Sequence, residues 1–463
     1  MKKWFMIYAA AMLLLTGCGR QGYADFNPPE QGASDLKPVA DIYAERHYEG
    51  IAPTAEQAME TVETVITGDG ACKIRCLKSY YDVTLDYSKG SPYEIGAAYA
   101  EAIVKVRGNY PAIVEEYLYE NIKAAFPNLA GDYTAIEQRT NTICNALRKE
   151  YQDEIRGFAD GICGDAEGFS DDGILSRGEA QLIQLVPDVL RGTACSALTA
   201  DGSATASGAR ITSRILEWQL GSENQLCTMH TLMHIQNGAS SFTSVTLFGI
   251  MSILTAINHD GVMMSILDVG SKEHVPYTTD DKRSYTYDIR YALEHCIHAR
   301  EAAEFLRDNA QHYPYCVNVL CTDAEDACVA ELSVEPDDGT PLLRDANTAL
   351  HDGLRWDDPA FLCVVNSFAA KGNADQLTYN ANNVIRWNRY HDLFCGQRGL
   401  TVSRYKELLT SEQLDNDLVR IRSGGVVHLV LADYDTRRLQ AVFPDTNGIA
   451  ETPEFIDLGS WET

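Results

Sequence analysis

Apolar residues recur along the chain with two different spacings, which divide it into a helical part and a part dominated by strands. Over 91–187 they return every three or four positions, as on one face of an α-helix. Beyond this block, short apolar and β-branched runs alternate with turn signals such as Asp201-Gly202, which are typical of strands and hairpins. Helical spacing returns over 287–309 and 384–409, and apolar runs near the C-terminus predict closing strands. This order predicts an α+β protein in which helices cover packed sheets.

The first residues have the layout of an export signal. A pair of lysines precedes an apolar run over 4–15, which is too short to span a bilayer, and Leu-Thr-Gly-Cys follows, ending at Cys18. This ending looks like a bacterial lipobox and implies a lipid on the Cys18 sulfur, with an ordinary signal peptide as the alternative. We expect a signal peptide over 1–17, a flexible tether over 18–48, and a mature protein anchored in the bacterial cell envelope, in the periplasm or at the cell surface.

Composition indicates a globular protein and excludes some partners. Of 463 residues, 45% are hydrophobic and 22% charged, which is typical of a folded chain long enough for a sizeable core. The net charge of -28 repels phosphate backbones, so we expect no nucleic-acid partner. Walker A, Gly-x-Gly-x-x-Gly and Gly-x-Ser-x-Gly motifs are missing from the sequence. We therefore expect no nucleotide cofactor and no serine nucleophile.

A cysteine with characteristic neighbours stands where the helical part meets the first predicted strand. Cys195 follows a short Gly-Thr-Ala stretch, and the predicted strand over 211–218 carries Arg214, Glu217 and Trp218. This arrangement resembles the penicillin acyltransferase-like family of N-terminal-nucleophile (Ntn) hydrolases, in which a processed Cys precedes a Gly-Arg-Asn-x-Asp-Trp strand. Arg214 and Trp218 match that pattern, and Glu217 occupies the position where the family has the Asp.

Two segments of the helical part are similar to the same family. They are the Gly-Ser-Pro-Tyr-x-x-Gly helix start over 90–96 and the Glu-x-x-Gly-x-Ala-x-Gly segment over 154–161. The resemblance implies a four-layer αββα Ntn-hydrolase sandwich as catalytic core over 195–463. A helical N-terminal region over 49–194, a propeptide or α-subunit, would precede it.

Further matches follow in the family's order. Asn258 lies in a strand-turn similar to one that carries an oxyanion-hole Asn, with a plain turn residue as the alternative. Asn366 lies in a segment that resembles the family's Asn-His-Phe. Arg389 and the Tyr after it fall where the family has an Arg-Tyr pair, and Arg386 is a competing candidate for the position of that Arg. The resemblance implies a catalytic site composed of Cys195, Arg214, Glu217, Asn258, Asn366 and Arg389.

The implied chemistry explains these residue types. Cleavage between Ala194 and Cys195 would free an α-amine with a pKa of ~7.7–8.0 to serve as general base. The Cys195 thiolate, favoured by Arg214, would attack a linear amide C–N bond and form a thioester, and Glu217 would orient the amine. Ala194 replaces the family's usual Gly, so a cleaved and an uncleaved chain are both compatible with the sequence.

The sequence therefore predicts a lipid-anchored cysteine Ntn hydrolase or acyltransferase. Its substrate would be a small acyl amide, and we expect no cofactor and no metal. One alternative is a bile-salt or N-acyl-lipid amidase of the same superfamily. Another is a non-catalytic extracytoplasmic lipoprotein on an inactive copy of the fold.

Two signals for metal binding are weak. His230 and His234 have the spacing of metal ligands on a helix, but 228–235 alternates like a strand and lacks the Glu of a zincin. The acidic stretch over 165–179 does not follow the ligand pattern of an EF-hand.

Thirteen cysteines are more than a lipid anchor and a nucleophile require. Eleven remain after Cys18 and Cys195, an odd number, so at least one of them stays unpaired within the chain. Cys316, Cys321 and Cys328 could suggest a metal cluster, but their spacing suits two paired strands and a turn, so we expect a disulfide or buried thiols there. Cys72 and Cys76 are another candidate pair.

Overall fold

The computed structural model describes residues 54–126, 129, 131–163, 166–190, 193–269, 282–334, 339–373, 381–411, 425–446 and 453–462. The predicted signal peptide, Cys18 and the tether to residue 48 lie outside the described residues. None of the helices described is long and apolar enough to cross a membrane.

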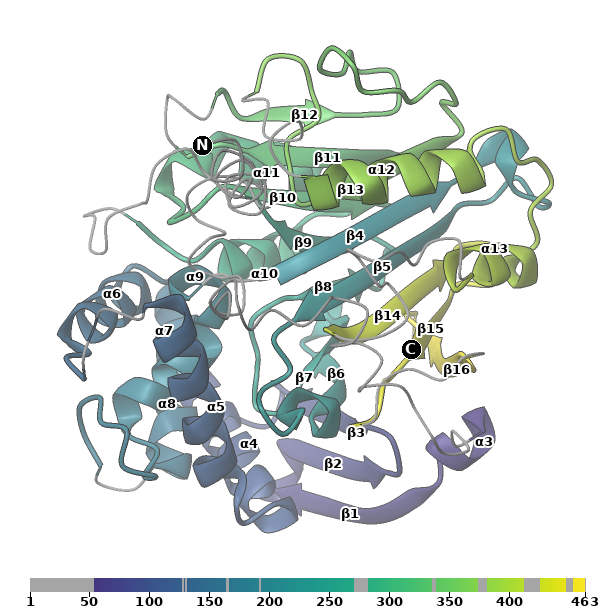
Figure 1. Cartoon of the computed structure of the whole chain (residues 1–463). Coiled ribbons are helices and arrows are strands. Elements are labelled where there is room, and N and C mark those ends of the chain that lie inside the picture. Colours follow the sequence, from purple (N-terminus) through teal and green to yellow (C-terminus); the bar gives the residue numbers. More distant parts are fainter. Residues whose placement is uncertain are drawn as a thin grey trace, which may run out of the picture.

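Two sheets form the centre of the molecule (Figure 1). The strands of the ten-stranded sheet are, in spatial order, β1 (Thr61–Thr67), β2 (Cys72–Leu77), β3 (Tyr81–Asp86), β6 (His230–Gln236), β7 (Phe242–Leu247), β8 (Thr255–Asn258), β9 (Met263–Asp268), β10 (Val317–Thr322), β11 (Ala327–Leu332) and β12 (Leu342–Arg344). Those of the six-stranded sheet are β13 (Phe361–Val365), β4 (Thr193–Ala200), β5 (Ile211–Trp218), β14 (Val426–Asp433), β15 (Arg438–Val442) and β16 (Ile456–Ser460). Neighbouring strands are antiparallel except β3 and β6, which run parallel.

Helices cover the outer faces of both sheets. They are α3 (Ala55–Ala58), α4 (Pro92–Val106), α5 (Tyr110–Ala125), α6 (Thr134–Asn145), α7 (Lys149–Ile162), α8 (Arg177–Gln184), α9 (Val186–Val189), α10 (Tyr285–His295), α11 (Ala299–Asn309), α12 (Ala381–Phe394) and α13 (Val402–Leu409). Helices α10 and α11 contact the ten-stranded sheet, and α12 lies along β13 and β4 of the other sheet (Figure 1).

The two sheets pack face to face through an apolar layer. Side chains of β6 to β9 such as Leu232 and Ile257 meet Val430 and Leu439 from β14 and β15. On the far side of the six-stranded sheet, aromatic residues of α12 and α13 such as Trp387 complete a separate cluster. The order helix, sheet, sheet, helix confirms the predicted α+β class and forms the four layers of an αββα sandwich.

The prediction of a helical region over 49–194 is wrong for residues 61–86. These residues form β1 to β3, which join the main sheet through the β3–β6 pair. Alternating burial of Cys72, Ile74 and Cys76 in β2 is the period-two pattern of a strand, which the helical interpretation overlooked. Helical structure is present over 92–189, as the spacing predicts.

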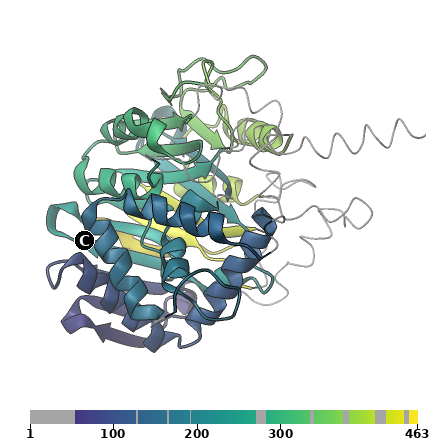
Figure 2. The same cartoon turned by 90° about the vertical axis from the view of Figure 1, so that its left-hand side faces the viewer.

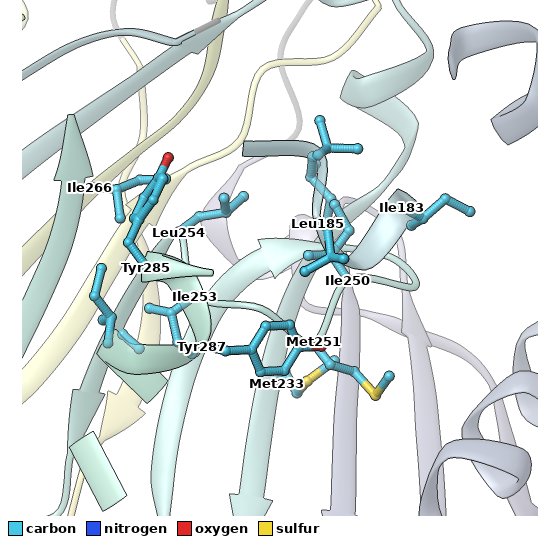
Figure 3. Packing of buried hydrophobic residues seen from close by; sticks show 14 of the residues in the cluster. Ile183, Leu185, Met233, Ile250, Met251, Ile253, Leu254, Ile266, Tyr285 and Tyr287 are labelled. Atoms are coloured by element: carbon cyan, nitrogen blue, oxygen red, sulfur yellow. The ribbon is translucent and has the colours of Figure 1, made fainter. Parts of the chain in front are cut away.

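The N-terminal strands and helices share one hydrophobic core with the rest of the chain. Figure 3 shows Ile183 and Leu185 from the end of α8 close to Ile250, which follows β7, and Met233 of β6 close to Tyr287 of α10. In Figure 2 the blue helices lie in front of the central strands, with the purple strands β1 to β3 below them. Residues on both sides of Cys195 are thus packed into the same interior.

Several cysteines of the described chain are buried thiols. Cys72 and Cys76 are four residues apart on β2, so their Cα atoms are about 13 Å apart, too far for a disulfide. That candidate pair is therefore wrong.

Cys321 and Cys328 are register partners on β10 and β11, and both are free thiols. Burial raises the pKa of Cys328 to about 12. Cys321 and Cys328 are therefore buried thiols and do not form a disulfide.

Helices α4 and α7 touch backbone to backbone through two glycines. A Cβ atom on Gly96 would lie 2.0 Å from the Glu154 carbonyl oxygen, and one on Gly157 would lie 1.9 Å from that of Tyr93. Both distances are far below van der Waals contact. The two glycines belong to the family-like segments that precede Cys195, so these motifs have a packing role.

We predict that Gly96→Ala and Gly157→Ala each lower the free energy of unfolding by about 3 kcal/mol, because the two backbones must separate. Urea unfolding followed by circular dichroism measures the change. Gly108→Ala is the matched control, since the nearest atom to its Cβ would be 3.7 Å away, and it should change stability by less than about 0.5 kcal/mol. Similar values for all three variants would contradict the close contact.

Candidate active site

Cys195 lies buried in β4 at the point where its neighbour β13 has ended. The last register pair between these strands joins Val365 to Ser196. Beyond it, side chains take the place of a partner strand: the Cys195 backbone N–H donates to Asn366 Oδ1, and the Cys195 carbonyl accepts from Arg386 Nη1 at 2.7 Å. The backbone of the predicted nucleophile is therefore held by an amide and a guanidinium group.

Asn366 is oriented by its hydrogen bonds. Its Oδ1 also accepts from Arg386 Nη2 at 2.8 Å, and its Nδ2 donates to the Asp268 carbonyl at the end of β9 at 2.7 Å. Because two donors converge on one end of the amide and a carbonyl faces the other, the network determines which atom is oxygen. Asn366 thus connects the two sheets directly beside Cys195.

The segment that carries Asn366 is clamped on both sides. Asn318 of β10 donates through Nδ2 to the carbonyls of Val365 and Ser367, both at 3.0 Å. Asn383 of α12 donates to Ser367 Oγ at 2.6 Å. These bonds explain why a residue just past the end of a strand has a defined position.

Glu217 and Arg386 form a buried ion pair next to the Ala194–Cys195 bond. Arg386 Nη1 lies 3.1 Å from Glu217 Oε2, and the two side chains are 1% and 10% exposed. Glu217 is the register partner of Ala194 on the neighbouring strand β5. Arg386 Nη2 also donates to Asn383 Oδ1, one helical turn earlier on α12. One guanidinium therefore connects α12, β4, β5 and the segment after β13.

Arg214 approaches Cys195 from the opposite face of the sheet. Its Nη2 lies 3.5 Å from Cys195 Sγ and donates to the Ile266 carbonyl at 2.9 Å. Arg214 and Glu217 are three apart on β5, and they lie on opposite faces as strand geometry predicts. Nε and Nη1 of Arg214 are buried and have no hydrogen-bond partner among the described residues. A positive charge with unused donors thus faces the thiol.

His428 is a neighbour that sequence reasoning missed. It lies fully buried on β14, and burial together with the charges of Arg214 and His230 holds its pKa well below the usual value. Its imidazole is therefore neutral at pH 7, and neither ring nitrogen has a hydrogen-bond partner within the described part of the chain. In the sequence, a single His within the otherwise apolar run over 426–431 could have drawn attention to this position.

Asn258 is not part of this cluster. Its Nδ2 donates to the carbonyls of Leu293 and Cys296 at the end of α10, at 3.0 and 2.9 Å, and its Oδ1 accepts from the Val262 N–H at 2.9 Å. The amide is used to fix a turn against a helix end. The structure supports the turn alternative and gives no support to the predicted oxyanion role.

Arg389 is also outside the site, and Arg386 takes the place predicted for it. Arg389 is exposed, whereas Arg386 is 1% exposed. The reason is the position of the buried stripe of α12. That stripe comprises Asn383, Arg386, Trp387, Tyr390 and Phe394. Asn383 was missed by sequence reasoning, although a polar residue one turn before Arg386 on the same stripe was a readable signal.

The structure brings together four of the predicted site residues, namely Cys195, Arg214, Glu217 and Asn366. The two guanidinium groups around the thiol oppose binding of a metal cation here. They favour instead an anionic or strongly polar group, such as a thiolate or a carbonyl oxygen that gains charge.

Comparison with known proteins adds a family match. The family model for acyl-coenzyme A:6-aminopenicillanic acid acyl-transferase matches residues 224–394, which include Asn366 and Arg386 and begin after Cys195. No curated protein matches the chain.

Three solved structures have low similarity to the chain. The N-acylethanolamine-hydrolyzing acid amidase ortholog of Caenorhabditis elegans is 15% identical, with a TM-score of 0.39 over 51% of this chain and 92% of that one. A variant of conjugated bile acid hydrolase from Clostridium perfringens is 10% identical, with a TM-score of 0.36 over 58% and 94%. Penicillin V acylase from Agrobacterium tumefaciens is 13% identical, with a TM-score of 0.33 over 57% and 86%. TM-scores this low do not assign an activity.

Over residues 224–394 the chain thus matches the model of the acyl-coenzyme A:6-aminopenicillanic acid acyl-transferase family, which confirms the family resemblance predicted from its sequence motifs.

Proposed function

We propose that the protein is a cysteine Ntn hydrolase or acyltransferase that cleaves a linear amide through a thioester on Cys195. The observation that carries this proposal is the convergence of three side chains on one residue. Asn366 holds the Cys195 N–H, Arg386 holds its carbonyl, and Arg214 lies 3.5 Å from its sulfur. The two backbone contacts would be needed at any buried residue beyond the end of β13, but a cysteine that only filled space would not need a guanidinium group beside its sulfur.

Arg214 is the group that favours ionisation of the thiol. A fixed positive charge beside a buried sulfur stabilises the thiolate, which is the nucleophilic form. The unused Nε and Nη1 donors of Arg214 are also our candidates for stabilising the oxyanion of the tetrahedral intermediate, because the amide of Asn258 is occupied elsewhere. A well-placed donor of this kind contributes on the order of 3 kcal/mol to catalysis.

The general base is proposed to come from the chain itself. Attack of the Cys195 thiol on the Ala194 carbonyl would move the acyl group from nitrogen to sulfur, and water would then release Ala194 as a carboxylate. The freed α-amine has a pKa of ~7.7–8.0 and can accept the thiol proton. Asn366 Oδ1 already accepts from this nitrogen, and Glu217 lies opposite Ala194, so both are positioned to orient the amine.

Substrate turnover would then follow in two steps. The thiolate adds to the substrate carbonyl, the C–N bond breaks, and the leaving amine takes a proton from the α-ammonium group. The resulting thioester is resolved by water, which gives a carboxylic acid, or by a second amine, which gives a new amide. The substrate class is a small acyl amide. A panel of N-acyl amino acids, penicillins, bile-salt conjugates and N-acyl ethanolamines would identify the acyl and amine parts.

Cys195 should be the site of both chain cleavage and acylation. We expect the intact mass of the purified protein to show two chains that separate between Ala194 and Cys195, and we expect activated esters to acylate Cys195. Cys195→Ala should give one chain and lower amidase activity by about 10⁴-fold or more. Cys163→Ala, which removes a thiol far along the chain, should behave like the wild type. A single uncleaved chain whose Cys195 resists acylation would favour the non-catalytic alternative.

The two arginines of α12 should differ in their effect on activity. Arg386→Lys should lower kcat/KM by about 10–100-fold, because an ammonium group cannot reproduce the fork that joins Cys195, Asn366 and Glu217. Arg389→Lys on the exposed side of the same helix should stay within about twofold of the wild type. Steady-state kinetics with thermal melting as a folding control measures both. Equal losses would show that the Arg386 contacts do not serve catalysis.

We also propose that Cys18 carries a lipid and anchors the protein in the bacterial cell envelope. The lipobox-like Leu-Thr-Gly-Cys ending supports this proposal. The wild type expressed with its own leader should partition into the detergent phase of a Triton X-114 extraction, and Cys18→Ser should move to the aqueous phase. Cys163→Ser should partition like the wild type. If Cys18→Ser partitioned like the wild type, the lipid anchor would be excluded.

A further inference from the structure

Three potential metal ligands meet at the C-terminal end of α12, away from Cys195. His391 is on α12, Cys395 follows one turn later, and Asp357 comes from the segment before β13. One ligand atom of each residue, namely a ring nitrogen, the sulfur and a carboxylate oxygen, lies within 4.8 Å of the other two. A helix that presents two ligands one turn apart is a common way to chelate a metal ion.

The imidazole of His391 lies between two carboxylates. Its Nε2 is 3.0 Å from Asp357 Oδ1, its Nδ1 is 3.1 Å from Asp392 Oδ1, and its side chain is only 7% exposed. A neutral imidazole has one N–H and can donate to only one of them. A cation at Nε2 would resolve this conflict, since it would bind the Asp357 carboxylate while Nδ1–H donates to Asp392. Histidines that bind metals usually make such a second bond to a carboxylate.

The surroundings carry negative charge near the sulfur. The carboxylates of Asp358 and Asp357 both act electrostatically on the Cys395 sulfur. Asp358 is compensated by Arg398 at 2.7 Å, and Arg355 approaches the other oxygen of Asp357 at 3.4 Å. Asp392 is 74% exposed and has no arginine or lysine partner in the described structure. The cluster therefore retains acidic groups that a divalent cation would neutralise.

We propose that Asp357, His391 and Cys395 bind a zinc ion, with water as the fourth ligand. A set of one sulfur, one nitrogen and one oxygen donor suits Zn²⁺, whereas Ca²⁺ and Mg²⁺ require oxygen ligands. Tetrahedral zinc places its ligand atoms about 3.5 Å apart, so the present separations need to close by only about 1 Å. His391 Nε2 and Asp357 Oδ1 are already 3.0 Å apart, so it is the Cys395 sulfur that has to approach the other two atoms.

Such an ion would join the segment before β13 to the helix that carries Asn383 and Arg386. Its role would be structural: it would fix the far end of α12. The site therefore does not depend on whether Cys195 is catalytic, and a failure of one proposal leaves the other intact.

The test uses Co²⁺ as a spectroscopic probe and Zn²⁺ as competitor, on the purified chain with Cys195→Ala to remove the other reactive thiol. We expect one Co²⁺ per chain with a thiolate-to-cobalt charge-transfer band, displaced by one equivalent of Zn²⁺ and unaffected by Ca²⁺. Cys395→Ser should abolish the band, and His391→Gln should weaken Co²⁺ binding at least tenfold. Asp392→Asn should weaken it by about 10–100-fold through the lost bond to Nδ1.

Cys163→Ser and His295→Gln are the matched controls, and both should retain the band and the affinity. Thermal melting should show a zinc-dependent rise in Tm for the control variants but not for Cys395→Ser. The proposal is overturned if Co²⁺ gives no charge-transfer band, or if the band survives in Cys395→Ser.

Discussion

The end of β13 is the constraint on which the rest of the site depends. A strand that stops one residue short leaves the N–H and carbonyl of its neighbour without partners, and in a buried sheet these groups must be satisfied. Here an amide and a guanidinium satisfy them at Cys195. The proposed cleavage between Ala194 and Cys195 would turn the Cys195 nitrogen from an amide into an amine. Side-chain partners could stay in place during that change, whereas hydrogen bonds to a neighbouring strand would have to rearrange. The clamp of Asn318 and Asn383 on the neighbouring segment is needed because a free strand end would not hold Asn366 in position.

The charges around Cys195 are informative as a set. Two side chains that contact Cys195, Arg214 and Arg386, are positively charged. Glu217, the ion-pair partner of Arg386, is negatively charged. Buried charges are costly unless they are compensated. Two positive charges against one negative charge leave this group of three with an excess positive charge. The site is therefore suited to a negatively charged or strongly polar group beside the sulfur.

Much of this architecture could be predicted from the sequence, and the failures have physical causes. Periodicity predicts the helices over 92–189 and the strand-rich remainder, because packing follows local spacing. It failed for β2, where a six-residue alternation is too short to compete with a long helical block. Motif similarity selected Cys195, Arg214, Glu217 and Asn366, which the structure brings together in one cluster. It could not choose between Arg386 and Arg389, because the choice depends on how α12 rotates against the sheet. It also misplaced Asn258, since a turn residue and an oxyanion donor look alike in sequence.

The single hydrophobic core that spans both sides of Cys195 has a consequence for how the protein regains its structure after denaturation. Before cleavage, β1 to β3 and the helices over 92–189 are tethered to the other half, and collapse is a unimolecular event. After the proposed cut the same interior must be reassembled from two separate polypeptides, so refolding becomes second order and depends on protein concentration. The cut would thus convert a reversible folding reaction into one that dilution makes effectively one-way, even though the native contacts are the same.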